Sequence, residues 1–285
     1  MSILFSPLSI RSVTFRNRLW VSPMCMYSAI DGVVQEWHHT HLAQFASGGA
    51  GLIVAEATAV VPEGRISPRD AGLWNDEQRD AWVPVVEAIH SRGAVAGIQL
   101  AHAGRKASTW WPWADARGSV PAADGGWTTT APSDIAFDGF AEPAALDQDG
   151  IDAVVEGFAS ATRRALDAGF DVLEVHGAHG YLLHQFLSPL SNLRDDEYGG
   201  SLENRARLLI RVVGAIREVA GDGVPVFVRI SATDHAEGGF TPDEAAIVSG
   251  WATEHGADLI DVSSGGLVAH QQISVFPGYQ VPLAE

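Results

Sequence analysis

The chain has 285 residues, 46% of them hydrophobic, and its 18 basic and 35 acidic side chains give a formal net charge of −17. This acidic balance disfavours phosphate backbones and anionic lipid surfaces, so we expect no nucleic-acid or membrane partner. The single cysteine, Cys25, excludes an internal disulfide and favours a reducing, cytoplasmic location. The N-terminus lacks the pattern of a signal peptide, and no apolar run is long enough to cross a bilayer.

Short apolar runs alternate with segments of helical periodicity along the chain. The expected strands are 19–23, 51–60, 95–101, 171–177, 224–231 and 258–264. The expected helices are 38–47, 76–92, 146–168, 201–220 and 241–255. Strands that alternate with helices are parallel because each return needs a crossover, and near-continuous apolar strands fit a sheet covered on both faces.

Polar side chains recur where the expected strands end. They are Ser22, Glu56, Gln99, His176, Arg229 and Ser263. Active sites of (β/α)8 barrels lie at this carboxyl rim, whereas no G-x-G-x-x-G motif follows the first strand to indicate a dinucleotide-binding fold. The sequence therefore predicts the α/β class and a TIM (β/α)8 barrel formed by one domain, 1–285. Only about six of the eight strand–helix units are found, so we expect strands seven and eight to be lacking.

The longest irregular region, 102–146, contains four of the nine tryptophans, namely Trp110, Trp111, Trp113 and Trp127. Loops of this length are commonly functional or disordered. Its aromatic content favours a lid or insertion that narrows a pocket, with a packed cap as the alternative.

The stretch EVHGAHGYLLHQF (174–186) places three histidines close together. Gly177 and Gly180 allow the chain to turn, so that His176 and His179 could face one pocket. Three interpretations stay open from spacing alone: a metal site with His184 as third ligand, a pair of hydrogen-bond donors, or satisfied buried histidines. For the second cluster, HHTH at 38–41, we expect a solvated helix end.

Several longer motifs occur in order along the chain. They are SPMCMYS (22–28), GLIVAEATAV (51–60), GIQLAHAGRKA (97–107), HGAHGYLLHQFLSPLSNLRDDEYGGSLENRARLL (176–209), FVRIS (227–231) and SSGGLV with FPGYQV (263–281). Together they resemble the Old Yellow Enzyme family, most closely its xenobiotic-reductase-like branch of bacterial ene-reductases with a first-strand cysteine.

This resemblance implies bound FMN, which NADPH or NADH reduces before hydride passes to the β-carbon of a small activated alkene, an α,β-unsaturated carbonyl or nitro compound. His176 and His179 would bind the substrate oxygen as N–H donors, as in an oxyanion hole. Tyr181 would supply the proton to the α-carbon as general acid. His184 then becomes structural, and no metal is expected.

The resemblance also assigns the flavin contacts and the quaternary structure. The implied FMN-binding residues are Ser22, Pro23, Met24, Cys25, Ala57, Gln99 and Arg229, with Tyr27 as a further substrate contact. Arg229 would be the fixed cation beside the flavin, with a structural salt bridge as the alternative. Arg105 and Lys106 receive no role, and we expect a homo-oligomer, a dimer or tetramer.

Two other functions stay open. Because the family's FMN phosphate is held by residues of strands seven and eight, this chain could be a catalytically incomplete barrel fragment. A metal-dependent barrel hydrolase would use His38, His41, His176 and His179. Related flavoproteins with an iron–sulfur cluster are excluded by the single cysteine.

Overall fold

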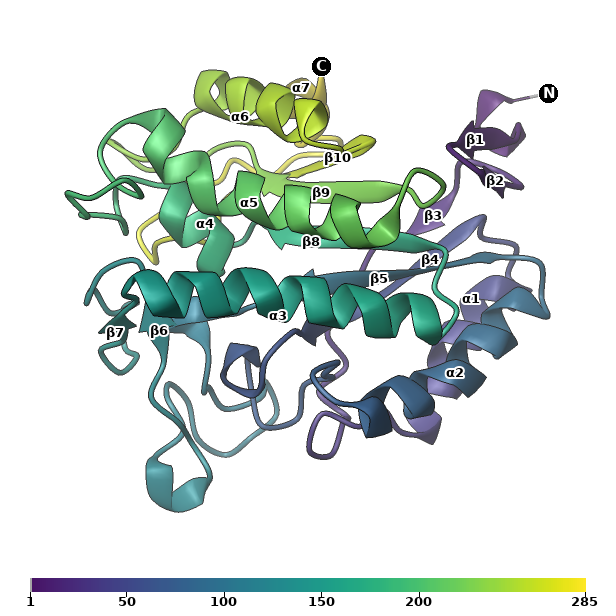
Figure 1. The fold of residues 1–285 in the computed structure, drawn as a ribbon, viewed down its shortest axis with the longest axis horizontal. Helices are drawn as coiled ribbons and strands as arrows, with labels where there is room; N and C mark the ends of the chain where they lie inside the picture. The colour runs from purple at the N-terminus through teal and green to yellow at the C-terminus, as the bar shows by residue number, and fades with distance from the viewer. Residues whose placement is uncertain (1) are drawn as a thin grey trace.

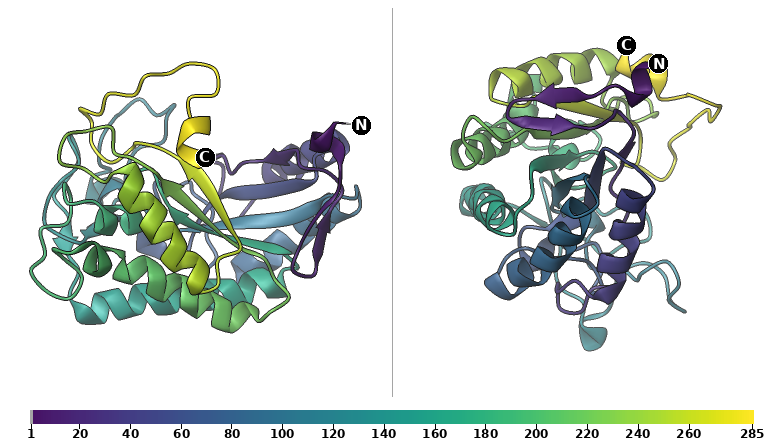
Figure 2. Two further views of the ribbon diagram at one scale, coloured as in Figure 1. Left: turned by 90° about the horizontal axis from the view of Figure 1, so that it is seen from above. Right: turned by 90° about the vertical axis from the view of Figure 1, so that its right-hand side faces the viewer.

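The computed structural model describes residues 2–285 and contains one parallel six-stranded sheet with the strand order β10-β9-β8-β5-β4-β3. The strands are β3 (Trp20–Val21), β4 (Leu52–Ala59), β5 (Val95–Ala101), β8 (Val172–Gly177), β9 (Val226–Ser231) and β10 (Leu259–Ser263). The sheet curls, and the long helices cover its convex face (Figures 1 and 2). This curled parallel sheet confirms the expected barrel type of architecture. That two of eight strands are lacking stays a prediction.

Five long helices follow the strands as expected. They are α1 (Glu36–Ser47), α2 (Asp76–His90), α3 (Gln148–Asp167), α5 (Leu202–Ala220) and α6 (Pro242–Glu254). Every expected helix and strand boundary lies within two residues of the observed one, because capping residues mark the ends. Asn75 and Thr241, for example, each cap the following helix through a reciprocal capping box.

Several shorter elements complete the fold. They are the antiparallel hairpin β1 (Leu8–Ile10) and β2 (Val13–Phe15), the short strands β6 (Thr130–Ala131) and β7 (Ala144–Ala145), and the short helices α4 (Leu182–Leu187) and α7 (Val281–Ala284). Single 3-10 turns occur at Ile3–Phe5, Pro62–Gly64, Gly104–Lys106 and Ala122–Asp124. Within residues 2–285, no helix combines the length and apolar character needed to cross a bilayer.

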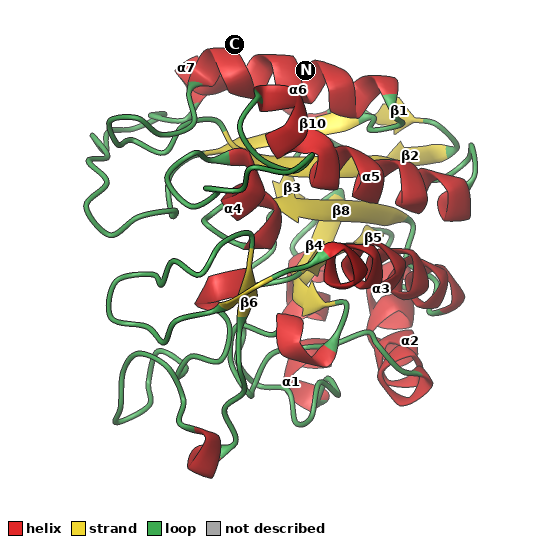
Figure 3. Ribbon diagram, turned by 60° about the vertical axis from the view of Figure 1, so that its left-hand side comes forward, coloured by secondary structure: helices red, strands yellow, loops and turns green. Residues whose placement is uncertain are grey.

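Successive side chains of each strand point to opposite faces, and this period of two separates two cores. Ile53, Val175 and Val228 point outward and pack with the helices in the larger core. Val172 and Phe227 point inward and pack in a smaller core, which Phe15 of the β1–β2 hairpin joins. The hairpin thus packs against the inner face, while long loops gather at the end toward which β8 points (Figure 3).

Two helical glycines differ in the space around them, which gives a matched test of the packing. A Cβ added at Gly214 of α5 meets no atom within 4 Å, whereas one at Gly157 of α3 meets Val61 Cγ1 at 2.9 Å. We expect Gly214→Ala to raise the free energy of unfolding by about 0.5–1 kcal/mol, because alanine restricts the unfolded chain. Gly157→Ala should lower it by about 1 kcal/mol, since the clash outweighs that gain. Urea unfolding followed by circular dichroism measures both, and a Gly157→Ala protein as stable as Gly214→Ala contradicts this packing.

Candidate functional site

A row of polar side chains crosses the inner face of the sheet toward its carboxyl end. The strand register pairs Gln99 with Glu174, and Arg229 with both His176 and Asp261. Gln99 Nε2 donates to Glu174 Oε1 at 2.8 Å, and Arg229 Nε lies 3.3 Å from Asp261 Oδ2. The structure therefore brings together Gln99, His176 and Arg229, three of the residues singled out from the sequence.

Burial controls the charges in this row. Glu174 is 2% exposed, and burial, with the nearby charge of Asp261, raises its pKa to about 8. Arg229 opposes this rise as the nearest cation, and its ion pair with Asp261 matches the alternative role considered for it. The salt bridge leaves the guanidinium on the inner face of the barrel, so a contact with a bound cofactor is compatible with it.

The chain turns sharply after β8. His179 and Gly180 carry the positive φ angles of this turn, +59° and +74°. The expectation that Gly177 also enables the turn is wrong, because Gly177 is the last residue of β8 and has no positive φ. The turn is held by the Ser231 hydroxyl, which accepts from the His179 N–H at 2.9 Å, and by Lys106 Nζ, 2.8 Å from the His179 carbonyl oxygen.

This turn brings His176, His179 and Tyr181 together. The His176 ring centroid lies 5.1 Å from that of His179 and 5.0 Å from that of Tyr181, both edge to face. Burial lowers the pKa of His179 to about 3 and that of His176 well below its usual range, so both rings are neutral at pH 7. Burial also raises the pKa of Tyr181, which keeps its phenol protonated. The expected meeting of the two imidazoles in one place is confirmed.

Cys25 and Tyr27 lie in the loop after β3. Cys25 and Tyr27 pack with Tyr181 against a small apolar cluster that contains Ala57. Trp127 of the 102–146 region joins this cluster, and Trp113 of the same region lies edge to face with Tyr27 at 5.7 Å.

Ser22 and Pro23 line a neighbouring hollow of about 480 Å³ on the inner face of the sheet, with Glu174 and Asp261. Met24 is exposed. Of the residues expected around FMN, Ser22 and Pro23 therefore line this hollow, whereas Cys25 and Ala57 belong to the apolar cluster at the rim.

The histidine cluster at 38–41 differs from the expectation. His38 is 1% exposed, and its Nε2 lies 2.9 Å from Glu56 Oε1, so the prediction of a wholly solvated helix end is wrong for this residue. A register shift in β4 between Ala55 and Ala57 makes a β-bulge, which turns the Glu56 side chain toward α1. Glu56 Oε2 also accepts from the Met26 N–H at 2.7 Å and so ties α1 to the loop that carries Cys25.

Within residues 2–285, no three histidine, cysteine or acidic side chains are grouped so that they could hold a metal ion. His184 Nε2 faces Asp234 Oδ1 at 2.8 Å, and His179 Nε2 faces Ser263 Oγ at 2.7 Å. Since His38 pairs with Glu56 at a different element, the four histidines of the hydrolase interpretation do not converge.

Sequence reasoning did not assign several residues that support the site. Lys106 bonds the carbonyl oxygens of both His179 and Gly266 at 2.8 Å, and Arg105 Nη2 donates to the Leu267 carbonyl oxygen at 2.8 Å. Their place in the motif GIQLAHAGRKA, after the strand-end Gln99, was a signal, but it did not reveal their partners, which lie on loops more than 70 residues away.

A curled parallel sheet with outer helices and a polar carboxyl rim defines a barrel enzyme of the (β/α) type. The chain belongs to the NADH:flavin oxidoreductase / NADH oxidase family, whose model matches residues 3–279. The NADPH dehydrogenase of Listeria welshimeri is 48% identical over 100% of this chain and 80% of its own length. That of Halalkalibacterium halodurans is also 48% identical, over 99% of this chain and 78% of its own length.

Solved structures agree with this assignment. Morphinone reductase superposes with a TM-score of 0.82 at 30% identity, covering 99% of this chain and 76% of that protein. An Old Yellow Enzyme homologue from Zymomonas mobilis gives a TM-score of 0.79 at 31% identity, covering 92% and 73%. The membership of the Old Yellow Enzyme family expected from the motifs is confirmed. The chain is an NAD(P)H-dependent flavin oxidoreductase that uses FMN.

The described residues fit this cofactor. The inner face carries one cation, Arg229, and one side-chain amide, Gln99, beside the apolar cluster of Ala57. His176 Nδ1 is buried with no hydrogen-bond partner in the protein, which is unusual for a buried polar atom and typical of a ligand site.

The low histidine pKa values predict acid sensitivity. Below pH 6.5 an unfolded histidine binds a proton, whereas His179 stays neutral down to about pH 3, so protonation of the unfolded state lowers the free energy of unfolding as the pH falls. We expect His179→Asn to reduce the pH dependence of that free energy by about 1.4 kcal/mol per pH unit between pH 6 and 4. Urea titrations at several pH values test this, because the difference between the two proteins removes the contribution of other groups. Equal slopes contradict the low pKa of His179.

Proposed function

We propose that this enzyme is an ene-reductase, which passes hydride from NAD(P)H through FMN to the β-carbon of an α,β-unsaturated carbonyl or nitro compound. One observation carries the proposal: two neutral imidazoles and a protonated phenol converge on one place at the barrel rim. Hydride addition builds negative charge on the substrate oxygen and then needs a proton on the α-carbon. The three side chains match these two needs.

His176 and His179 bind and polarise the substrate oxygen in this proposal. A neutral imidazole has one N–H, and its neighbour decides which nitrogen carries it. For His179, this neighbour is the Ser263 hydroxyl, 2.7 Å from Nε2. When this hydroxyl donates to Nε2, the proton of His179 lies on Nδ1, which is then the nitrogen that donates to the substrate.

Tyr181 holds the proton for the α-carbon. Its phenol is half-buried, and Lys106 Nζ lies 5.2 Å from the ring centroid. Burial lowers the pKa of that lysine to about 8, with a contribution from the charge of Arg105. At pH 7 this amine is still mostly charged, and a cation beside the ring favours the phenolate that remains after the proton has left.

FMN, when bound, supplies the hydride chemistry between the nicotinamide and the alkene. Among the chain's own residues, Arg229 is the fixed cation suited to the flavin's pyrimidine edge, and Gln99 has both a donor and an acceptor. The backbones of Ser22, Pro23, Met24, Cys25 and Ala57 complete the contacts that we assign to the flavin.

Finer features belong to the same proposal. Cys25 lies in the rim cluster with Tyr27 and Tyr181. This position supports assignment to the family branch with a first-strand cysteine, and it supports a substrate contact at Tyr27. Trp113 and Trp127 support the role of 102–146 as a lid that narrows the pocket. We further assign the enzyme to the cytoplasm as a homo-oligomer, the first on its single cysteine.

We also propose that further strands close the sheet between β3 and β10. Within residues 2–285, β3 pairs with β4 alone and β10 with β9 alone, and the hollow of about 480 Å³ lies along both. Unpaired strand edges invite another strand, whether from a longer form of this chain or from a second chain. Purified 285-residue protein that loses its flavin absorption on gel filtration favours the catalytically incomplete alternative. Retained flavin supports the proposed enzyme.

Tyr181→Phe tests the proton donor. Removing the general acid should slow oxidation of the reduced flavin by 2-cyclohexenone by about 100-fold or more, and leave flavin reduction by NADPH unchanged. Stopped-flow absorbance of the flavin measures the two half-reactions separately. Tyr198→Phe is the matched control, because that hydroxyl bonds Arg211 away from the rim. If the enone oxidises the reduced flavin of Tyr181→Phe at the rate of the unaltered enzyme, the assigned role is ruled out.

A further inference from the structure

His184, in the middle of α4, is fully buried between the turn after β8 and the loop after β9. Its Nδ1 lies 2.9 Å from the backbone nitrogen of Gly180, and its Nε2 lies 2.8 Å from Asp234 Oδ1. Both side chains of the pair are 0% exposed. Neither residue is among those assigned above to the substrate or the flavin.

The contacts of His184 fix its tautomer. A backbone N–H can only donate, so the Gly180 N–H requires a lone pair on Nδ1. The single proton of the neutral ring then lies on Nε2, the nitrogen 2.8 Å from Asp234 Oδ1. His184 thus acts as a rigid connector that accepts at one end and donates at the other.

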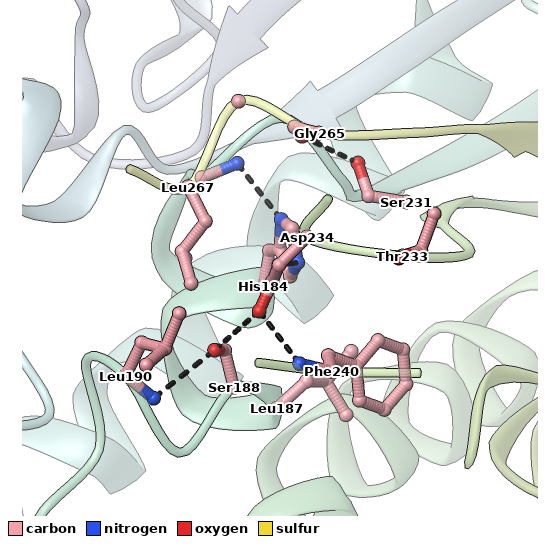
Figure 4. A network of polar contacts seen from close by, with 12 residues as sticks. His184, Leu187, Ser188, Leu190, Ser231, Thr233, Asp234, Phe240, Gly265 and Leu267 are labelled. Carbon is pink, nitrogen blue, oxygen red and sulfur yellow. Dashed lines mark hydrogen bonds and ion pairs between the residues drawn. The ribbon is translucent and has the colours of Figure 1, made fainter. Parts of the chain in front are cut away.

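Asp234 is fixed in turn by other parts of the chain. Its Oδ2 accepts from the Ser188 hydroxyl at 2.6 Å and from the Phe240 N–H at 2.7 Å, as Figure 4 shows. Oδ2 therefore serves these two donors, while Oδ1 faces His184 Nε2. An amide at position 234 has one acceptor oxygen and cannot serve both sides.

We propose that His184 and Asp234 are a positioning pair for the turn that carries His179 and Tyr181. His179 holds the left-handed conformation that a side chain disfavours, so the turn persists only where its surroundings determine it. Other hydrogen bonds hold the remaining backbone groups of the turn. The Ser231 hydroxyl accepts from the His179 N–H, and Gln185 donates to the Gly180 carbonyl oxygen at 2.7 Å. His184 alone accepts the Gly180 N–H, the amide between the donor histidine and the proton-donor tyrosine.

This inference rests on the proposed ene-reductase function, because it assigns the pair to the half-reaction that uses His179 and Tyr181. Loss of the Gly180 contact would let the turn relax and move both side chains. A displacement near 1 Å at a reacting group slows the reaction by about 100-fold. A pair that only stabilises the core would change stability without a selective effect on that half-reaction.

The test compares His184→Leu, which removes the hydrogen bond to Gly180 and the polar contact with Asp234, with His184→Gln, whose amide restores an acceptor and a donor. The holoenzymes are reduced with dithionite and mixed with 2-cyclohexenone or with oxygen, which needs no proton from Tyr181. We expect His184→Leu and Asp234→Asn to slow oxidation by saturating enone about 10- to 100-fold. Oxidation by oxygen should stay within about 3-fold, and His184→Gln should recover most of the enone rate.

His90→Leu is the matched control. His90 Nε2 and Asp171 Oδ2 form a second histidine–aspartate pair at 2.7 Å, at the opposite end of β8. The enone should oxidise the reduced flavin of this variant at the rate of the unaltered enzyme. Equal slowing by His184→Leu and His90→Leu, equal slowing with enone and oxygen, or no slowing in either His184→Leu or Asp234→Asn overturns the inference.

Two further outcomes stay decisive. If His184→Leu and Asp234→Asn yield no holoenzyme, ¹⁵N spectra of histidine-labelled unaltered enzyme, assigned by difference with His184→Gln, decide the tautomer. A proton on Nε2 supports the inference, and a proton on Nδ1 overturns it. If the unaltered reduced enzyme reacts with oxygen but not with the enone, the proposed function itself fails. If that enzyme reduces the enone and the His184 variants do so equally fast, only the present inference fails.

Discussion

The two-residue period of the parallel strands is the constraint on which the rest of this structure depends. In β8, Leu173 and Val175 must face the helices, so Glu174 and His176 necessarily face the interior of the barrel. The neighbouring strand repeats this logic and places Arg229 beside His176. A register slip of one residue would bury the polar row among the helices, so the hydrophobic outer core also fixes the orientation of the chemistry.

Burial then decides which of these polar groups carry charge. The chain is strongly acidic overall, yet its rim presents neutral imidazoles, a protonated phenol and one lysine with a lowered pKa. Desolvation is the first cause of each of these shifts, and it disfavours the charged form in every case. The two imidazoles and the phenol are therefore suited to stay neutral at pH 7 until negative charge develops on a substrate.

Much of the architecture could be predicted from the sequence, because periodicity and capping are local properties. The helices and strands lie within two residues of expectation, and the strand-end rule alone identifies Gln99, His176 and Arg229. The burial of His38 could not be predicted, because it depends on a β-bulge that redirects Glu56 from another strand. The left-handed turn at His179 was equally hidden, since its supports at Ser231 and Lys106 lie more than 50 residues away along the chain.

Two buried histidines reveal a common way of joining elements in this barrel. Gln35 donates its N–H to His38 Nδ1 at 2.9 Å, just as Gly180 donates to His184, and each ring presents Nε2 to a buried carboxylate. Each carboxylate, Glu56 or Asp234, uses its second oxygen to accept a further backbone N–H, at 2.7 Å in both cases. Each member of such a network has a fixed donor or acceptor role, so its groups fit together in only one arrangement. One of these two networks ends at the loop of Cys25 and the other at the turn of Tyr181. The contacts that give the interior a single arrangement therefore also set the geometry of the rim.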